Sequence, residues 1–242
     1  MFRKSAACLL VAFFFLAGGV GFARAENLLA RTEVGCVKAL AFSPDGALLV
    51  AVTLGVEVRR APTLEKVGFL RAQTGFVTCM ALAPDGSLLA LGSEKKVELW
   101  DMASGSLIRI LEGHTNWVRS LTFSPDGQFL ASTADDKTVR LWEVASWNCV
   151  ATLQGHRNWV MSVAFSPDGR FCASGSIDKT VILWDWRKGG PVFTLYHDAG
   201  VSTVVFPRVG IFWLQGWTMT QYGSGTFKPE RSFGPSKAVA RA

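Results

Sequence analysis

The residue types that many enzymes and metal sites require are scarce in this chain. Among its 242 residues there are only three histidines, and no cysteine stands in the C-x-x-C or Cys/His spacing of a zinc site. The chain also lacks the G-x-S-x-G motif of a nucleophilic serine and the glycine-rich P-loop that binds phosphate. We therefore expect no metal, no cofactor and no catalytic site of these kinds.

An excess of positive charge is confined to the two ends of the chain. The formal net charge is +6, but residues 1–25 contain three basic residues and no acidic one, and residues 207–242 contain five basic residues and one acidic one. Residues 26–206 keep 17 basic and 18 acidic residues and are close to neutral. Because no basic stripe is interleaved with aromatic residues, the sequence does not favour nucleic-acid binding.

Few cysteines are present, and four of them follow the first 25 residues: Cys36, Cys79, Cys149 and Cys172. In an oxidising compartment four cysteines allow three disulfide pairings. Cys79, Cys149 and Cys172, however, replace ordinary strand residues at core-like positions, where a free thiol behaves as a small apolar side chain. The sequence favours buried free thiols and leaves disulfide formation open.

The first 25 residues have the pattern of a secretory signal peptide. A basic pair, Arg3-Lys4, precedes an apolar run at residues 8–20, and Ala23-Arg24-Ala25 fits a cleavage site. The alternative is an uncleaved membrane anchor, for which the run is near the lower length limit. We expect cleavage after Ala25, a secreted or periplasmic location, and no membrane association afterwards.

A five-residue phrase recurs through the chain. Phe-Ser-Pro-Asp-Gly occupies residues 42–46, 123–127 and 165–169, and Leu-Ala-Pro-Asp-Gly occupies residues 82–86. The intervals of 40, 41 and 42 residues are typical of repeat architectures. Pro presets the second position of a turn, Asp suits the third and Gly closes it, so each phrase predicts a tight turn.

Around each turn the sequence predicts four short strands. Apolar or alternating runs such as residues 161–165 and 170–174 flank the turn, and a third and a fourth strand follow, as at residues 181–185 and 150–153. The predicted units are residues 28–66, 67–107, 108–149 and 150–191, with a partial fifth unit at 192–206.

Paired residues at fixed places in these units resemble the signature of WD-repeat β-propellers. Gly113-His114 and Gly155-His156 share one position, and Trp100-Asp101 and Trp184-Asp185 share another. The resemblance extends over residues 28–206 and implies an all-β, incomplete propeller of about four and a half four-stranded units. An open arc of this kind has exposed edge strands and apolar faces, which predicts self-association.

In that family a buried His, Ser or Thr, Asp and Trp form a hydrogen-bonded tetrad within a blade, and the resemblance implies two complete tetrads here. The third unit supplies His114, Ser132, Asp136 and Trp142, and the fourth supplies His156, Ser174, Asp178 and Trp184. The second unit matches only at Trp100, with Glu94 as a candidate replacement for Asp, and the first unit matches nowhere.

The same resemblance gives a structural role to each histidine that could otherwise be catalytic. All three histidines occupy the Gly-His position of a unit, so none remains as a base or a metal ligand. The aspartates of the recurring phrase could form a ring of carboxylates, but turn chemistry explains them better: Asp45, Asp85, Asp126 and Asp168. We expect no catalytic residue.

The loops that follow the Gly-His pairs contain the candidate interaction residues. Loops on a rigid scaffold carry binding functions, and Trp and Arg dominate the energetics of interfaces. The candidates are Asn116, Trp117, Asp135, Arg157, Asn158 and Trp159. The alternative is that both Trp side chains pack between blades, which the equivalent position of Phe76 in the second unit favours.

Residues 207–242 fit no part of a unit. If one base is restored after Phe206, the codons allowed by the tail can read F-S-P-G-G-x-F-L-A-S-G-x-D-x-D-T-V-R-L-W-D, which matches residues 165–185 in length and pattern. We interpret the tail as an out-of-frame translation of the fifth unit, against the alternative of an unrelated natural tail. The nucleotide sequence of the gene distinguishes the two.

The resemblance to WD-repeat propellers implies a non-catalytic scaffold that binds other proteins, and the N-terminal segment adds the expectation that this scaffold is exported from the cytoplasm. One alternative is an exported propeller enzyme or ligand-binding protein whose active residues lie in blades missing from this chain. The other is a non-functional frameshifted fragment.

Overall fold

The computed structural model describes residues 38–42, 48–52, 56–60, 63, 65–206, 211–214, 217–222 and 226–230. Within these ranges every regular element is a β-strand and none is a helix, so no described helix is available to cross a membrane. The all-β prediction is confirmed. The predicted signal peptide, residues 1–25, and Cys36 lie outside the described residues.

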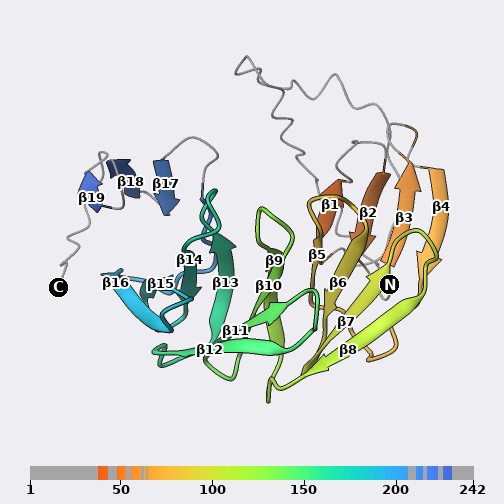
Figure 1. Ribbon diagram of the computed structural model, residues 1–242, viewed down its shortest axis with the longest axis horizontal. Helices are drawn as coiled ribbons and strands as arrows, with labels where there is room; N and C mark the ends of the chain where they lie inside the picture. Colours follow the sequence, from red (N-terminus) through yellow and green to blue (C-terminus); the bar gives the residue numbers. More distant parts are fainter. Residues whose placement is uncertain are drawn as a thin grey trace, which may run out of the picture.

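The strands from residue 40 to residue 196 form four antiparallel sheets, each with four strands in chain order (Figure 1). The first two sheets contain β1 (Leu40–Phe42), β2 (Leu48–Val52), β3 (Val56–Arg60) and β4 (Glu65–Leu70), then β5 (Cys79–Leu82), β6 (Leu88–Gly92), β7 (Lys96–Asp101) and β8 (Leu107–Glu112). The next two contain β9 (Val118–Phe123), β10 (Phe129–Ala134), β11 (Thr138–Glu143) and β12 (Cys149–Gln154), then β13 (Val160–Phe165), β14 (Cys172–Ser176), β15 (Thr180–Asp185) and β16 (Gly190–Tyr196).

The four sheets follow one another around an open arc, with their first strands on the inner side (Figure 1). Strand β9 lies against both β5 and β13, and β1 contacts β5. Side-chain hydrogen bonds also join neighbouring units on the inner side: Thr78, directly before β5, donates through Oγ1 to the carbonyl of Val118 in β9 at 2.6 Å, and the amide of Val204 donates to Ser162 Oγ in β13 at 3.0 Å. The prediction of an incomplete propeller is confirmed.

The unit boundaries read from the sequence do not coincide with the ends of the sheets. The predicted units end at residues 66, 107, 149 and 191, where the outer strand of each sheet has just begun. Each outer strand pairs with the third strand of its own sheet, as β12 does with β11. An outer strand therefore belongs to one unit in sequence and to the preceding unit in space.

In the second, third and fourth sheets the recurring phrase forms the turn between the first and second strand. The glycine amide donates to the carbonyl three residues earlier, from Gly127 to Ser124 at 2.9 Å and from Gly169 to Ser166 at 2.8 Å. Both glycines have a positive φ, +70° and +67°, which L-residues with a Cβ rarely adopt. The aspartate accepts the amide two residues later, from Gln128 to Asp126 at 3.0 Å. Turn formation accounts for this carboxylate.

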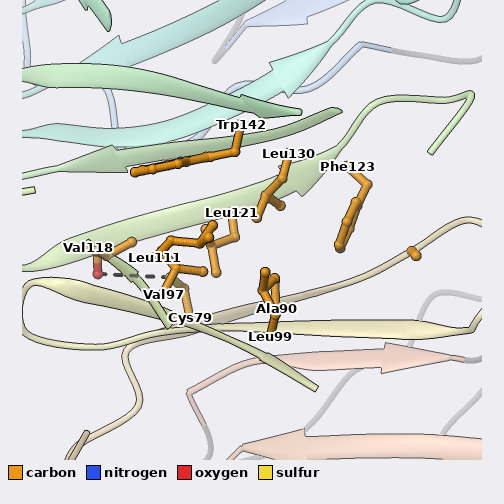
Figure 2. Close-up of a cluster of buried hydrophobic side chains, with 11 residues drawn as sticks. Cys79, Ala90, Val97, Leu99, Leu111, Val118, Leu121, Phe123, Leu130 and Trp142 are labelled. Carbon is orange, nitrogen blue, oxygen red and sulfur yellow. Dashed lines mark hydrogen bonds between the residues drawn. The ribbon is translucent and has the colours of Figure 1, made fainter. Parts of the chain in front are cut away.

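Apolar side chains fill the spaces between neighbouring sheets. Between the second and third sheets, Cys79, Val97 and Leu111 meet Val118 and other side chains of β9, β10 and β11 (Figure 2). Fully burying one large apolar side chain stabilises a fold by roughly 1.5–3 kcal/mol. Gly92 allows this close approach, because a Cβ there would lie 2.9 Å from Val118 Cγ1 and 2.5 Å from Cys79 Sγ.

The partial fifth unit, residues 192–206, contains most of β16 and a segment at 201–206 that packs on the fourth sheet without forming a strand. Val201 and Val204 are buried against the fourth sheet, in one apolar cluster with Phe171, Leu183 and Leu195. Farther along, a separate three-stranded sheet contains β17 (Ile211–Leu214), β18 (Trp217–Tyr222) and β19 (Thr226–Glu230). The out-of-frame origin of this tail stays a prediction.

At the other end of the arc, the first sheet exposes apolar side chains. Leu40, Phe42 and Phe69 are each more than a third exposed, whereas the alternating Ala39 and Ala41 pack against the core of the second sheet. These exposed side chains are the ones through which we expect self-association of an open arc.

Candidate functional site

The third sheet brings together the four residues of its expected tetrad. His114 precedes β9, Ser132 lies in β10, Asp136 follows β10, and Trp142 lies in β11. His114 Nδ1 lies 2.8 Å from Asp136 Oδ2, and His114 Nε2 lies 2.8 Å from Ser132 Oγ. Trp142 Nε1 donates to the same serine oxygen at 2.8 Å. The four side chains form one continuous chain of hydrogen bonds.

The fourth sheet repeats this arrangement. His156 lies 2.9 Å from Asp178 and 2.8 Å from Ser174, and Trp184 Nε1 donates to Ser174 Oγ at 2.8 Å. Because the indole can only donate, the serine hydroxyl must give its own proton to His156 Nε2, and Nδ1–H then donates to Asp178. The network therefore assigns one tautomer to the histidine.

The environment of these groups keeps the histidine neutral and the aspartate charged. Burial lowers the pKa of His156 below its ordinary value, although Asp178 opposes the shift. Burial would raise the pKa of Asp178, but hydrogen bonds from Thr180, the Arg157 amide and His156 outweigh it, and the pKa lies below its usual range. Both histidine side chains are only 1% exposed. A base in this position has no access to a substrate.

The second sheet satisfies its tryptophan with a different residue from the one expected. Glu94 is exposed, so the suggestion that it replaces the tetrad aspartate is wrong. Glu98, buried in β7, accepts from Trp100 Nε1 at 2.9 Å and from the amide of Gln73 at 2.8 Å. It also accepts from the hydroxyl of Thr74 at 2.6 Å. One carboxylate thus ties the tryptophan to the loop before the inner strand.

The candidate interaction residues lie on one rim of the arc. The loops before β9 and β13 meet the loops after β10 and β14 there: the amide of Asp135 donates to the carbonyl of Trp117 at 2.9 Å, and that of Ile177 to Trp159 at 3.0 Å. Asn116 and Asn158 use their side-chain oxygens to accept the amide of the following tryptophan, at 2.9 and 2.8 Å. The two asparagines therefore fix the loops rather than project from them.

The tryptophans at this rim are not part of the core. Neither Trp117 nor Trp159 belongs to an apolar cluster between the sheets, although Trp117 is half-buried. Trp159 is 46% exposed, and Phe76, at the equivalent place of the second sheet, is 68% exposed. The apolar clusters between the blades therefore do not account for Trp159 or Phe76.

An ion pair between Asp135 and Arg119 joins the loop after β10 to β9 at this rim. Asp135 is buried and accepts from Arg119 Nε at 2.7 Å and from a second guanidinium nitrogen. The hydrogen bond to Asp135 raises the pKa of Arg119. The guanidinium also lies over the ring of Trp159, 5.5 Å from its centroid, at cation–π distance. Arg119 directly follows the buried Val118 in β9, and no motif in the sequence singles it out.

The family described as WD domain, G-beta repeat (WD40) matches residues 64–101, 105–143 and 147–185. The ranges 105–143 and 147–185 each contain one complete tetrad. Each matched range begins with the outer strand of the preceding sheet, as 147–185 does with β12. The chain contains three WD40 repeats.

Curated relatives match this chain over short stretches only. Nuclear distribution protein PAC1 of Arthroderma otae is 51% identical over 43 residues, which is 18% of this chain and 9% of the relative. The protein of the same name from Tuber melanosporum is 49% identical over 49 residues, 20% of this chain and 11% of the relative. The chain matches about a tenth of the length of these relatives.

The cysteines of the WD repeats differ in exposure. Cys79 and Cys172 are buried free thiols, and burial raises the pKa of Cys79 to about 12. Burial also raises the pKa of Cys172. Cys149 is free but exposed, so its predicted core position is wrong, because the first residue of the outer strand β12 lies at the edge of the sheet. Within the described ranges, no three His, Cys, Asp or Glu side chains are grouped as metal ligands.

Proposed function

We propose that this chain is a non-catalytic scaffold that binds other proteins through the rim around Trp159. The observation that supports this most directly is that Trp159 is 46% exposed and yet held by Arg119, which is itself held by the buried Asp135. A large aromatic side chain that is fixed before binding loses little conformational entropy in a complex. Aromatic side chains of this kind are the usual anchors of protein interfaces.

The absence of catalysis in this proposal rests on how the histidines are used. His114 and His156 are buried within tetrads, and each ring nitrogen has a hydrogen-bond partner. His197 lies half-buried in the loop after β16, where burial lowers its pKa. The relatives named nuclear distribution protein match one short stretch, so they do not identify the partner of this chain.

Photo-crosslinking in the cells that make the protein tests this proposal. With a photoreactive phenylalanine analogue at position 159 or 76, we expect the same partner protein to be captured. The same analogue at Lys188, exposed in the loop before β16 on the opposite rim, should not capture it. Untagged wild-type chain should compete for the partner, and Trp159→Ala should compete about tenfold less well. Equal capture from position 188 would contradict the proposal.

We further propose that the protein is exported. The basic pair, the apolar run and the Ala23-Arg24-Ala25 site support cleavage by a signal peptidase. Expressed with its own N-terminus in its source cells, the chain should be recovered outside the cytoplasm with Glu26 as its first residue, as measured by N-terminal sequencing. Replacing Ala23 and Ala25 by bulky residues should block processing. A cytoplasmic product that begins at Met1 would refute export.

A further inference from the structure

The carboxylates in the loops after β10 and β14 are used within the protein. Asp135 pairs with Arg119, Asp136 binds His114, and Asp178 binds His156. Their side chains are 3%, 7% and 8% exposed. Although these loops look balanced in charge in the sequence, none of the three negative charges is presented to a partner.

The cations of the same rim, in contrast, are exposed to solvent. Lys137 and Lys179 each follow one of these carboxylates directly, and Arg157 follows His156; all three residues are exposed. None of them forms an ion pair with another described residue. Glu112, at the end of β8, is exposed but pairs with Lys96 at 2.7 Å. The other exposed acids of the equivalent loops lie on either side of this group: Glu94, next to Lys95, in the second sheet, and Asp198 after His197. Between them the rim presents positive charge.

Trp159 contacts residues that lie in, or are bonded to, the two loops that contain Lys137 and Lys179. Its carbonyl accepts from Ile177, two residues before Lys179, and its ring is covered on one side by Arg119, which is bonded to the loop that contains Lys137. Ile177 is itself 38% exposed. An apolar surface formed by Trp159 and Ile177 is therefore flanked by unpaired cations from two neighbouring blades.

We propose that this surface, formed by Lys137, Arg157, Trp159, Ile177 and Lys179, binds an acidic segment of the partner protein. An apolar side chain of the segment covers Trp159 and Ile177, and its carboxylates pair with the cations around them. This inference rests on the proposed function and names the chemistry of its partner. Burial of the aromatic surface supplies affinity, and the charges select acidic partners and speed their encounter.

A synthetic peptide tests the inference on the full chain. The probe is a fluorescein-labelled peptide in which glutamates flank a single phenylalanine, and binding is measured by fluorescence anisotropy. We expect Trp159→Ala and the double variant Arg157→Glu, Lys179→Glu each to raise Kd about tenfold or more. Arg157 can be changed because only its backbone amide binds Asp178. Higher salt should weaken binding, since exposed charges are screened.

Matched controls separate charge selection from general effects. Lys188→Glu on the opposite rim should leave Kd unchanged, and the peptide with glutamine in place of glutamate should bind about tenfold more weakly. Arg157→Gln with Lys179→Gln should give an intermediate Kd, and circular dichroism melts establish that each variant is folded. If the glutamine peptide binds equally well, or Lys188→Glu weakens binding as much as the double variant, the inference is wrong. Partner capture at position 159 would then still support the proposed function. If neither the peptide discrimination nor the partner capture is observed, both the inference and the proposed function are refuted.

Discussion

Ser174→Ala should lower the free energy of unfolding by about 3 kcal/mol, because two buried polar groups lose their partner together. The serine hydroxyl accepts from Trp184 Nε1 and donates to His156 Nε2, and all three side chains are buried. The alanine methyl group offers neither interaction. For a chain of this size we expect the melting temperature to fall by roughly 6–12 °C in circular dichroism.

The controls for this prediction come from the same chain. Ser132→Ala should have the same effect in the third sheet, since its oxygen makes the equivalent bonds at the same distances. Ser202→Ala, at an exposed position, should change stability by less than about 0.5 kcal/mol. A change in Ser174→Ala as small as that of Ser202→Ala would show that the tetrad does not stabilise its sheet.

Acidification should destabilise the protein in two stages. The pKa of His156 in the folded protein is lowered by burial, so between its ordinary value of about 6.5 and the lower folded value the unfolded chain binds the extra proton. This contribution to stability is present above pH 6.5 and is lost as pH falls through the folded pKa. His197, whose pKa burial also lowers, acts in the same direction.

The second stage belongs to the tetrad aspartates. Burial opposes the charge on Asp136, but hydrogen bonds from His114 and Thr138 outweigh it, so its folded pKa lies below its ordinary value. The pKa of Asp178 is lowered in the same way. Their contribution is present above about pH 4 and is lost as pH falls further.

The melting temperature measured from pH 8 to pH 3 at constant ionic strength checks both stages. His156→Gln, which cannot titrate, should reduce the fall between pH 6.5 and pH 5 and leave the fall below pH 4 in place. A melting temperature that stays constant or rises between pH 7 and pH 5 would contradict the sign of the first stage.

The sequence was sufficient to predict features that depend on spacing within one unit. The turn phrase predicts where two strands reverse, since Pro, Asp and Gly each act on their own backbone. The tetrad residues stand at the same intervals in the third and fourth units, and the structure brings each set together. Features that depend on residues at fixed intervals within one unit can therefore be predicted without knowing how the units pack together.

Features that depend on contacts between distant residues were not predicted. Glu98 reaches Gln73, 25 residues away, and no pattern in the sequence marks a carboxylate that turns back to the preceding loop. Arg119 acts through Asp135 and across to Trp159 in the next blade. Cys149 shares the apolar character of its strand, but the outer strand has no neighbour on one side. The contacts and the burial of these three residues depend on how the blades pack against one another, which the sequence of a single unit does not contain.

The offset between repeats and sheets has a consequence for synthesis on the ribosome. The matched repeat at 147–185 begins with β12, which closes the sheet that the repeat at 105–143 opened. A blade therefore remains unfinished until the first strand of the following repeat has emerged. At roughly 5–20 residues per second, residues 144–154 take about 0.5–2 s to synthesise, and during this time the outer edge of β11 has no partner strand. During the corresponding interval in each sheet, β7, β11 or β15 is the segment most available to a chaperone.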